Sequence, residues 1–156
     1  MVTSIDAYNK FGWPEDHKNM ALVYTPRELA IDAFPRRIYM NRVLIEPLFC
    51  AFQKLIDTCC YDEITTWDGC FNIRPKRGYE KKYKYFLSVG DKRSAAKYLS
   101  LHAWGLAVDI NAFENKMHTK GKLSSKFVEC FTSSGFDWGG NFSGRLDPMH
   151  FQLSKI

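Results

Sequence analysis

The sequence lacks the features that mark a membrane protein or a disordered chain. No apolar run approaches the roughly 20 residues of a membrane-spanning helix. Residues 1–9 include an acidic residue and lack the apolar segment of a secretion signal. No low-complexity tract and no internal repeat is visible. We therefore expect a soluble protein without a membrane span, made in the cytoplasm without a signal peptide.

The cysteines are few and poorly spaced for either of their usual structural roles. There are five, an odd number, and no two of them form a C-x-x-C pair. This pattern fits neither a disulfide framework nor a thiolate zinc knuckle. We predict reduced thiols, most of them buried.

The length and apolar content favour one compact domain. With 156 residues, 46% of them hydrophobic and 15% aromatic, the chain can bury a real core but is short for two domains. We expect a single domain over 1–156. Its first part, 1–69, is predicted to be a wrapping segment followed by a helix, and the core that carries the candidate site is predicted to span 70–153.

Apolar spacing predicts two helices. Between residues 45 and 56, apolar side chains recur at steps of three and four, which places them on one helical face. Pro47 fits best in the first turn of this helix. A second helix is predicted after Ser124 or Ser125 and ends before Gly135. Residues 1–35 are interrupted by glycine and proline and are predicted to be irregular.

Short apolar runs predict the strands. Residues 63–67 and 70–74 flank an Asp-Gly dipeptide, which favours a hairpin turn between two strands. Residues 106–110 and 149–153 are predicted to be further strands. This order of elements predicts an α+β fold with a small antiparallel sheet and flanking helices.

Basic residues concentrate in one part of the chain. The formal net charge is +5, and lysine, arginine and tyrosine interleave most densely over 74–97. Such a stretch could bind nucleic acid, an anionic cell envelope or an acidic substrate, or it could be a solvated loop. Because the motifs of common nucleic-acid folds are absent, we expect no nucleic-acid partner.

Two of the four histidines lie in segments that also contain aspartate. His102 precedes Asp109 by seven residues, and His150 follows Asp147 by three. Two imidazoles and a carboxylate are the ligand types that leave a catalytic zinc ion with an open fourth position. We therefore predict a Zn²⁺ site formed by His102, Asp109 and His150. The other histidines, His17 and His118, are predicted to be ordinary side chains.

The predicted elements can bring these ligands together. Asp109 lies in a predicted strand, and a turn at Gly105 can fold His102 back beside it. His150 begins another strand that can pair alongside. Asp147 would then lie near the metal without binding it, as the acid/base that activates the zinc-bound water.

Five further residues are candidates for support or substrate binding. The oxyanion of a tetrahedral intermediate needs positive charge, for which Arg74 is the first candidate and Arg77 the second. Ser100 is predicted to support the metal loop by hydrogen bonding. Trp104 and Trp138 either line the substrate cleft or pack in the core.

The whole pattern resembles a known family. S-x-H-x-x-G-x-A-x-D from Ser100, G-F-x-W-G-G from Gly135 and D-x-x-H-F-Q from Asp147 are similar to motifs of zinc peptidases. This family includes D-alanyl-D-alanine carboxypeptidases and phage L-alanyl-D-glutamate endopeptidases. The resemblance extends to Cys70-Phe71-Asn72-Ile73-Arg74 and covers residues 70–153.

The resemblance implies a fold and a set of roles. The fold is that shared by these peptidases and the Hedgehog signalling domain. His102, Asp109 and His150 are then the zinc ligands, and Asp147 is the catalytic acid/base. Arg74 corresponds to the substrate-binding arginine upstream of the first ligand, although the long insertion before Ser100 leaves Arg77 as an alternative.

The resemblance also implies a substrate. Aspartate at position 147 is common among phage-type endopeptidases, whereas many carboxypeptidases have glutamate there. The expected activity is therefore endolysin-like cleavage of the L-alanyl-D-glutamate bond in peptidoglycan stem peptides. A D-alanyl-D-alanine carboxypeptidase or dipeptidase is the alternative, and a non-catalytic zinc-stabilised binding domain is an alternative of another class. We expect a monomer that acts on the cell wall after release, or as part of a virion.

Overall fold

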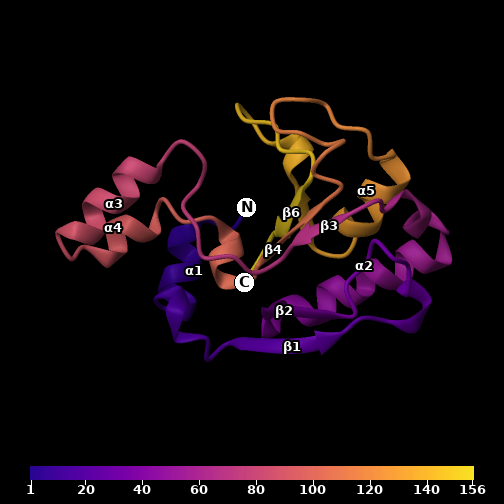
Figure 1. Cartoon of the computed structure of the whole chain (residues 1–156), viewed down its shortest axis with the longest axis horizontal. Helices are drawn as coiled ribbons and strands as arrows, with labels where there is room; N and C mark the ends of the chain where they lie inside the picture. Colours follow the sequence, from indigo (N-terminus) through magenta and orange to yellow (C-terminus); the bar gives the residue numbers. More distant parts are fainter.

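The protein is α+β, with two small antiparallel sheets, as predicted (Figure 1). The computed structural model describes all residues from 1 to 156. The larger sheet has the strand order β3 (Trp67–Gly69), β4 (Ala107–Ile110), β6 (His150–Leu153) and β5 (Phe136–Trp138). The smaller sheet pairs β1 (Met20–Tyr24) with β2 (Arg37–Asn41). Strands β4 and β6 were both predicted, and they lie side by side at the centre of the larger sheet.

Two amphipathic helices cover the larger sheet. They are α2 (Ile45–Asp57) and α5 (Ser125–Thr132), which pack against each other. The rings of Phe131 in α5 and Phe151 in β6 stack with their centroids 4.4 Å apart, and both side chains are fully buried. Both helices lie where the apolar spacing predicts them, with Pro47 in the first turn of α2 and Ser124 as the cap of α5.

The N-terminal segment is more regular than predicted. It contains α1 (Ser4–Phe11) as well as β1, where the glycines and prolines had indicated irregular chain. Thr3 and Asp6 form a capping box, each side chain accepting a hydrogen bond from the other residue's backbone N–H. The T-x-x-D spacing was therefore an available signal for this helix.

The predicted hairpin around Asp68 and Gly69 is wrong. These residues lie inside β3, which pairs with β4 across an irregular register, so that Gly69 lies opposite Asp109. The Asp68 carboxylate accepts a hydrogen bond from the backbone N–H of Ala112, 2.7 Å away. The side chain of Asp68 thus joins two distant segments instead of closing a local turn. Residues 70–74 form no strand, although Pro75 makes a single bridge to Leu99.

The basic stretch is helical and projects from the body of the molecule (Figure 1). It forms α3 (Glu80–Ser88) and α4 (Lys92–Ala96), where the sequence had predicted no helix and left a solvated loop as one alternative. No residue of α3 is buried, which explains why the apolar spacing gave no helical signal. Lys82 lies over the rings of Tyr79 and Tyr98, 5.9 and 5.8 Å from their centroids.

Short 3₁₀ turns complete the chain. They are η1 (Pro14–Asp16), η2 (Arg27–Leu29), η3 (Arg42–Leu44), η4 (Cys60–Glu63), η5 (Leu101–Trp104) and η6 (Gly139–Asn141). All five cysteines are free, and Cys60, Cys70 and Cys130 are buried. None of the helices combines the length and the apolar character required to cross a bilayer.

Candidate metal centre

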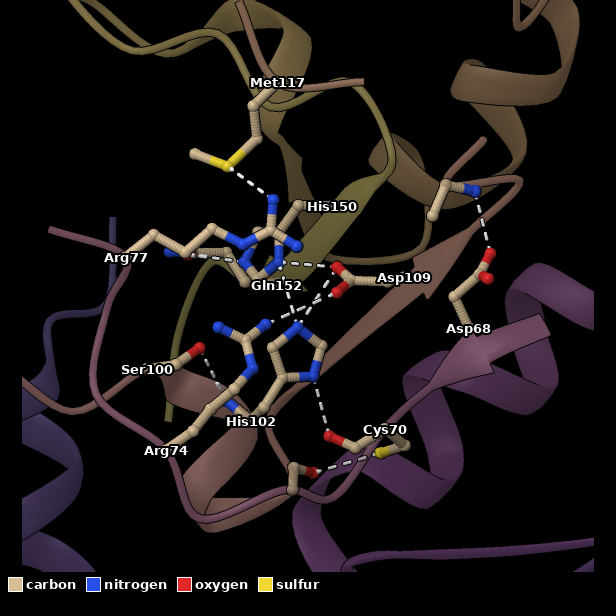
Figure 2. A network of polar contacts seen from close by, with 12 residues as sticks. Asp68, Cys70, Arg74, Arg77, Ser100, His102, Asp109, Met117, His150 and Gln152 are labelled. Carbon is tan, nitrogen blue, oxygen red and sulfur yellow. Dashed lines mark hydrogen bonds and ion pairs between the residues drawn. The ribbon is translucent and has the colours of Figure 1, made fainter. Parts of the chain in front are cut away.

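The structure brings His102, Asp109 and His150 to one point (Figure 2). Asp109 in β4 and His150 in β6 are directly opposite each other in the antiparallel register. His102 lies in η5, and the chain then turns back at Gly105, whose φ is 64°. A side chain at Gly105 would place a Cβ 2.8 Å from the backbone nitrogen of Asn41, so glycine is required there for conformation and space.

The three facing atoms form a nearly equilateral triangle. His102 Nε2 lies 3.1 Å from Asp109 Oδ1, and His150 Nδ1 lies 3.0 Å from the same oxygen. The two ring nitrogens are 3.2 Å apart. Ligands about 2.0–2.1 Å from a tetrahedral zinc ion lie about 3.3–3.4 Å from one another. The triangle is therefore close to one face of a zinc tetrahedron, and the two imidazoles favour zinc over magnesium or calcium, which prefer oxygen ligands.

Hydrogen bonds on the outer side of each ring orient the ligand nitrogens. His102 Nδ1 lies 2.8 Å from the Cys70 carbonyl oxygen, which can only accept, so this nitrogen carries the proton. His150 Nε2 lies 3.2 Å from Gln152 Oε1, and the amide nitrogen of Gln152 donates to the Val2 carbonyl. These contacts leave His102 Nε2 and His150 Nδ1 free to bind a metal, an arrangement typical of zinc sites.

The local electrostatics favour an ionised carboxylate among the ligands. Burial opposes ionisation of Asp109, but hydrogen bonds from His102 and His150 outweigh it and hold its pKa well below the usual range. Burial also disfavours the charged ring of His150, yet its hydrogen bond with Asp109 keeps the pKa of His150 above the ordinary value. A metal bound by these ligands would therefore compete with protonation of His150.

A cavity of about 560 Å³ opens onto this group. Asp109, His150, Gln152 and Asp147 are among the residues that line it. Its cationic side chains come from two separate segments, and they are Arg74, Lys76, Arg77 and Arg145. The volume is in the range of small-ligand sites, and the excess of positive charge favours an anionic ligand.

Asp147 lies in this cavity but not among the three metal ligands. Its backbone N–H donates to the Gly139 carbonyl, and its own carbonyl accepts from the His150 N–H, 3.0 Å away. A Cβ at Gly139 would overlap the Asp147 backbone, so the Gly139-Gly140 turn allows this close approach. Burial raises the pKa of Asp147, and its Oδ1 is buried without a hydrogen-bond partner. Such a carboxylate is suited to exchanging protons with a bound ligand.

Residues 93–153 match the sequence family described as D-alanyl-D-alanine carboxypeptidase. The resemblance to this peptidase family is confirmed. The matched part, less than half of the chain, contains the three candidate ligands, Ser100 and Asp147. It does not include Arg74 or Arg77. No curated protein and no solved structure matches the chain.

Arg74 and Arg77 lie outside the part matched to the carboxypeptidase family, and both line the cavity. Arg74 Nη2 lies 3.7 Å from Asp109 Oδ2, so its charge lies beside the metal group. Ser100 connects the backbone of Arg74 to that of His102. Its N–H donates to the Arg74 carbonyl, and its Oγ accepts from the His102 N–H. Arg77 lies farther out, with a weak contact from Nη1 to the Met117 sulfur at 3.6 Å.

The two tryptophans named in the sequence analysis do not line the cavity. Trp104 is buried and donates from Nε1 to the Gly12 carbonyl. Trp138 donates to the Pro148 carbonyl and faces the ring of Phe151. Both side chains therefore pack against other parts of the chain. Of the two alternatives given for them, lining the substrate cleft or packing in the core, the structure shows packing.

Several residues of the site were not found from the sequence. Gln152 had an available signal, since it lies two positions after His150 in a strand and so faces the same side. The Cys70 carbonyl, Arg145 and Met117 had none, because only the tertiary fold brings them to the cavity.

Proposed function

We propose that the protein is a zinc-dependent peptidoglycan hydrolase that cleaves the L-alanyl-D-glutamate bond of stem peptides, as an endolysin does. The observation that carries the proposal is the unpartnered Oδ1 of Asp147 in a cavity that is also lined by Asp109 and His150, two of the three residues of the metal group. The match to a peptidase family supports the same reaction class. A zinc ion in this group would polarise a water molecule and lower its pKa to about 7.

Asp147 is the residue proposed to move the proton. Because burial raises its pKa, the carboxylate is a better base than an exposed aspartate when it takes a proton from the attacking water. The protonated form can then donate to the nitrogen of the leaving amine. Acid/base catalysis of this kind is typically worth about 10²- to 10⁴-fold in rate.

Arg74 is proposed to stabilise negative charge beside the metal group. Its guanidinium lies next to Asp109, where the oxygen of a carbonyl under attack would develop charge. It could equally hold a substrate carboxylate one bond away from the scissile amide, since both groups lie within the same small volume. The side chain is about one third exposed, at 35%, so a substrate can reach it.

A purely structural zinc site is less consistent with this geometry. Structural sites usually close the fourth position with another protein ligand. Here the group contains three residues and opens into a cavity of about 560 Å³. Burying Asp147 Oδ1 without a hydrogen-bond partner also costs stability, and a role in proton transfer gives a reason for that cost.

Two observations bear on which bond is cut. The description of the matched family favours a D-alanyl-D-alanine carboxypeptidase as the second candidate. The aspartate at position 147 favours the endopeptidase. We propose that the enzyme reaches its stem peptides in the cell wall after release from the host cytoplasm, or as part of a virion.

Digestion of purified peptidoglycan tests the proposal. The zinc-loaded protein is incubated with the polymer, and the released ends are identified by mass spectrometry. New L-alanine C-termini support the endopeptidase, and free D-alanine supports the carboxypeptidase. Activity that survives both chelation and the substitution Asp147→Asn would refute the metal-dependent mechanism.

A further inference from the structure

Arg77 is the one cationic side chain of the cavity without an oxygen acceptor. Arg74 is paired with Asp109, and Lys76 Nζ donates to the Lys97 carbonyl at 3.0 Å. Arg145 Nη1 donates to the Arg77 carbonyl at 2.7 Å. The Arg77 guanidinium itself contacts only the thioether of Met117. Most of its five N–H donors are therefore available to a ligand.

Arg145 fixes the backbone at Arg77. It comes from the loop between η6 and β6, two residues before Asp147, and its hydrogen bond spans the cavity to the segment that leads into α3. This contact ties the loop of the proposed acid/base to the loop that carries Arg77. The position of the Arg77 guanidinium relative to Asp147 thus depends on a contact that only the folded chain makes.

The two arginines face the same group from the same side. Figure 2 shows the guanidinium groups of Arg74 and Arg77 both pointing toward Asp109 and His150. The acidic side chains that line the cavity are Asp109 and Asp147, and both have proposed roles at the metal group. Burial raises the pKa of Asp147 and the Arg77 charge opposes this rise, but no ion pair joins the two side chains, so the N–H donors of Arg77 remain available to a ligand.

We propose that Arg77, held in place by Arg145, forms a second anion subsite, so that the cavity selects peptides with two carboxylates. This inference rests on the proposed function. In the L-alanyl-D-glutamate bond, the free α-carboxylate of glutamate is attached to the carbon that bears the scissile nitrogen, within reach of Arg74. A carboxylate on the following residue is the group assigned to Arg77. The planar guanidinium fork matches a carboxylate through two parallel hydrogen bonds.

A matched pair of peptides tests the subsite. Acetyl-L-Ala-γ-D-Glu-L-Ala is prepared with a free C-terminal carboxylate and as the C-terminal carboxamide, both retaining the glutamate α-carboxylate. The zinc-loaded wild-type protein is expected to cleave the dicarboxylate with a kcat/KM about tenfold higher, the size of one charge-assisted hydrogen bond at a partly exposed site. Arg77→Gln is expected to abolish this preference by slowing cleavage of the dicarboxylate alone, and Arg77→Lys to restore part of it.

Two further variants complete the experiment. Lys81→Gln removes a charge from the exposed face of α3, outside the cavity, and is expected to keep the preference. Arg145→Gln is expected to reduce the ratio of the two kcat/KM values about threefold, because Arg145 acts by positioning Arg77.

The outcomes separate the subsite from the proposed function. Equal kcat/KM values for the two peptides with the wild-type protein would overturn the subsite and leave the endopeptidase intact. An equal loss on both peptides in Arg77→Gln would also overturn it. If the wild-type protein cleaves neither peptide, the L-alanyl-D-glutamate assignment itself is refuted, and the subsite proposal with it.

Discussion

Zinc should stabilise this protein strongly at neutral and alkaline pH and much less in mild acid. The three ligand atoms lie 3.0–3.2 Å apart, close to the separation in a zinc tetrahedron, so binding needs little rearrangement. Free zinc at 100 times its Kd adds about 2.7 kcal/mol to the free energy of unfolding. For a domain of this size, that corresponds to a rise in Tm of about 5–10 °C. We expect this rise at pH 8.

The pH dependence follows from two groups of the metal-free site. The raised pKa of His150 stabilises the metal-free fold fully below its unfolded value of about 6.5, and this contribution is lost as pH rises through the folded pKa. The lowered pKa of Asp109 contributes above its unfolded value of about 3.9 and is lost as pH falls through its folded pKa. The pair therefore supports the metal-free fold best between about pH 4 and 6.5.

Zinc has the opposite preference, because it must displace the proton on His150. The gain in Tm should therefore grow from pH 6 to pH 8. Thermal unfolding followed by circular dichroism, with zinc, with magnesium and with a chelator at each pH, measures this gain. The matched control is His118→Gln, which changes an exposed histidine that does not line the cavity and should behave like the wild-type protein. A zinc effect that is independent of pH, or an equal effect of magnesium, would refute the reasoning.

Three other changes have defined outcomes. Asp147→Asn should lower kcat about 10²- to 10⁴-fold, while elemental analysis still finds one zinc ion per chain; loss of the zinc would show that Asp147 is a ligand instead. Gln152→Ala removes the acceptor that orients His150 and should weaken zinc binding about 10- to 100-fold, measured by competition with a chromophoric chelator. Phe131→Ala empties the stack between α5 and β6 and should cost about 3–5 kcal/mol in urea unfolding. A cost below about 1 kcal/mol would contradict the packing described here.

The ligand group could be predicted because its parts lie in short segments with clear local patterns. Asp109 and His150 each lie in an apolar run that predicts a strand, and Gly105 indicates the turn that returns His102. The helices α2 and α5 were predictable for a similar reason, since one face of each is apolar. These signals depend on neighbours a few residues apart.

Two segments were predicted wrongly or not at all, because their structure depends on the folded chain and not on the local sequence. Asp68 and Gly69 favour a turn locally, but hydrogen bonds to β4 and to Ala112 stabilise them as part of a strand. The helix α3 buries no residue, so its sequence has no apolar face to recognise. For Asp68 and Gly69, contacts with distant residues outweigh the local preference for a turn. For α3, the absence of buried side chains leaves no apolar periodicity in the sequence.

The convergence of His102, Asp109 and His150 was therefore predictable from residue types and spacing, because all three lie in short segments with clear local patterns. The contacts around the site that would make it selective for a ligand could be identified only from the tertiary structure. The contact of Gln152 with Val2, the hydrogen bond from Arg145 to the Arg77 carbonyl and the cationic cavity all join residues far apart in the chain. No local pattern encodes such contacts, since they exist only once the core has packed and placed the loops.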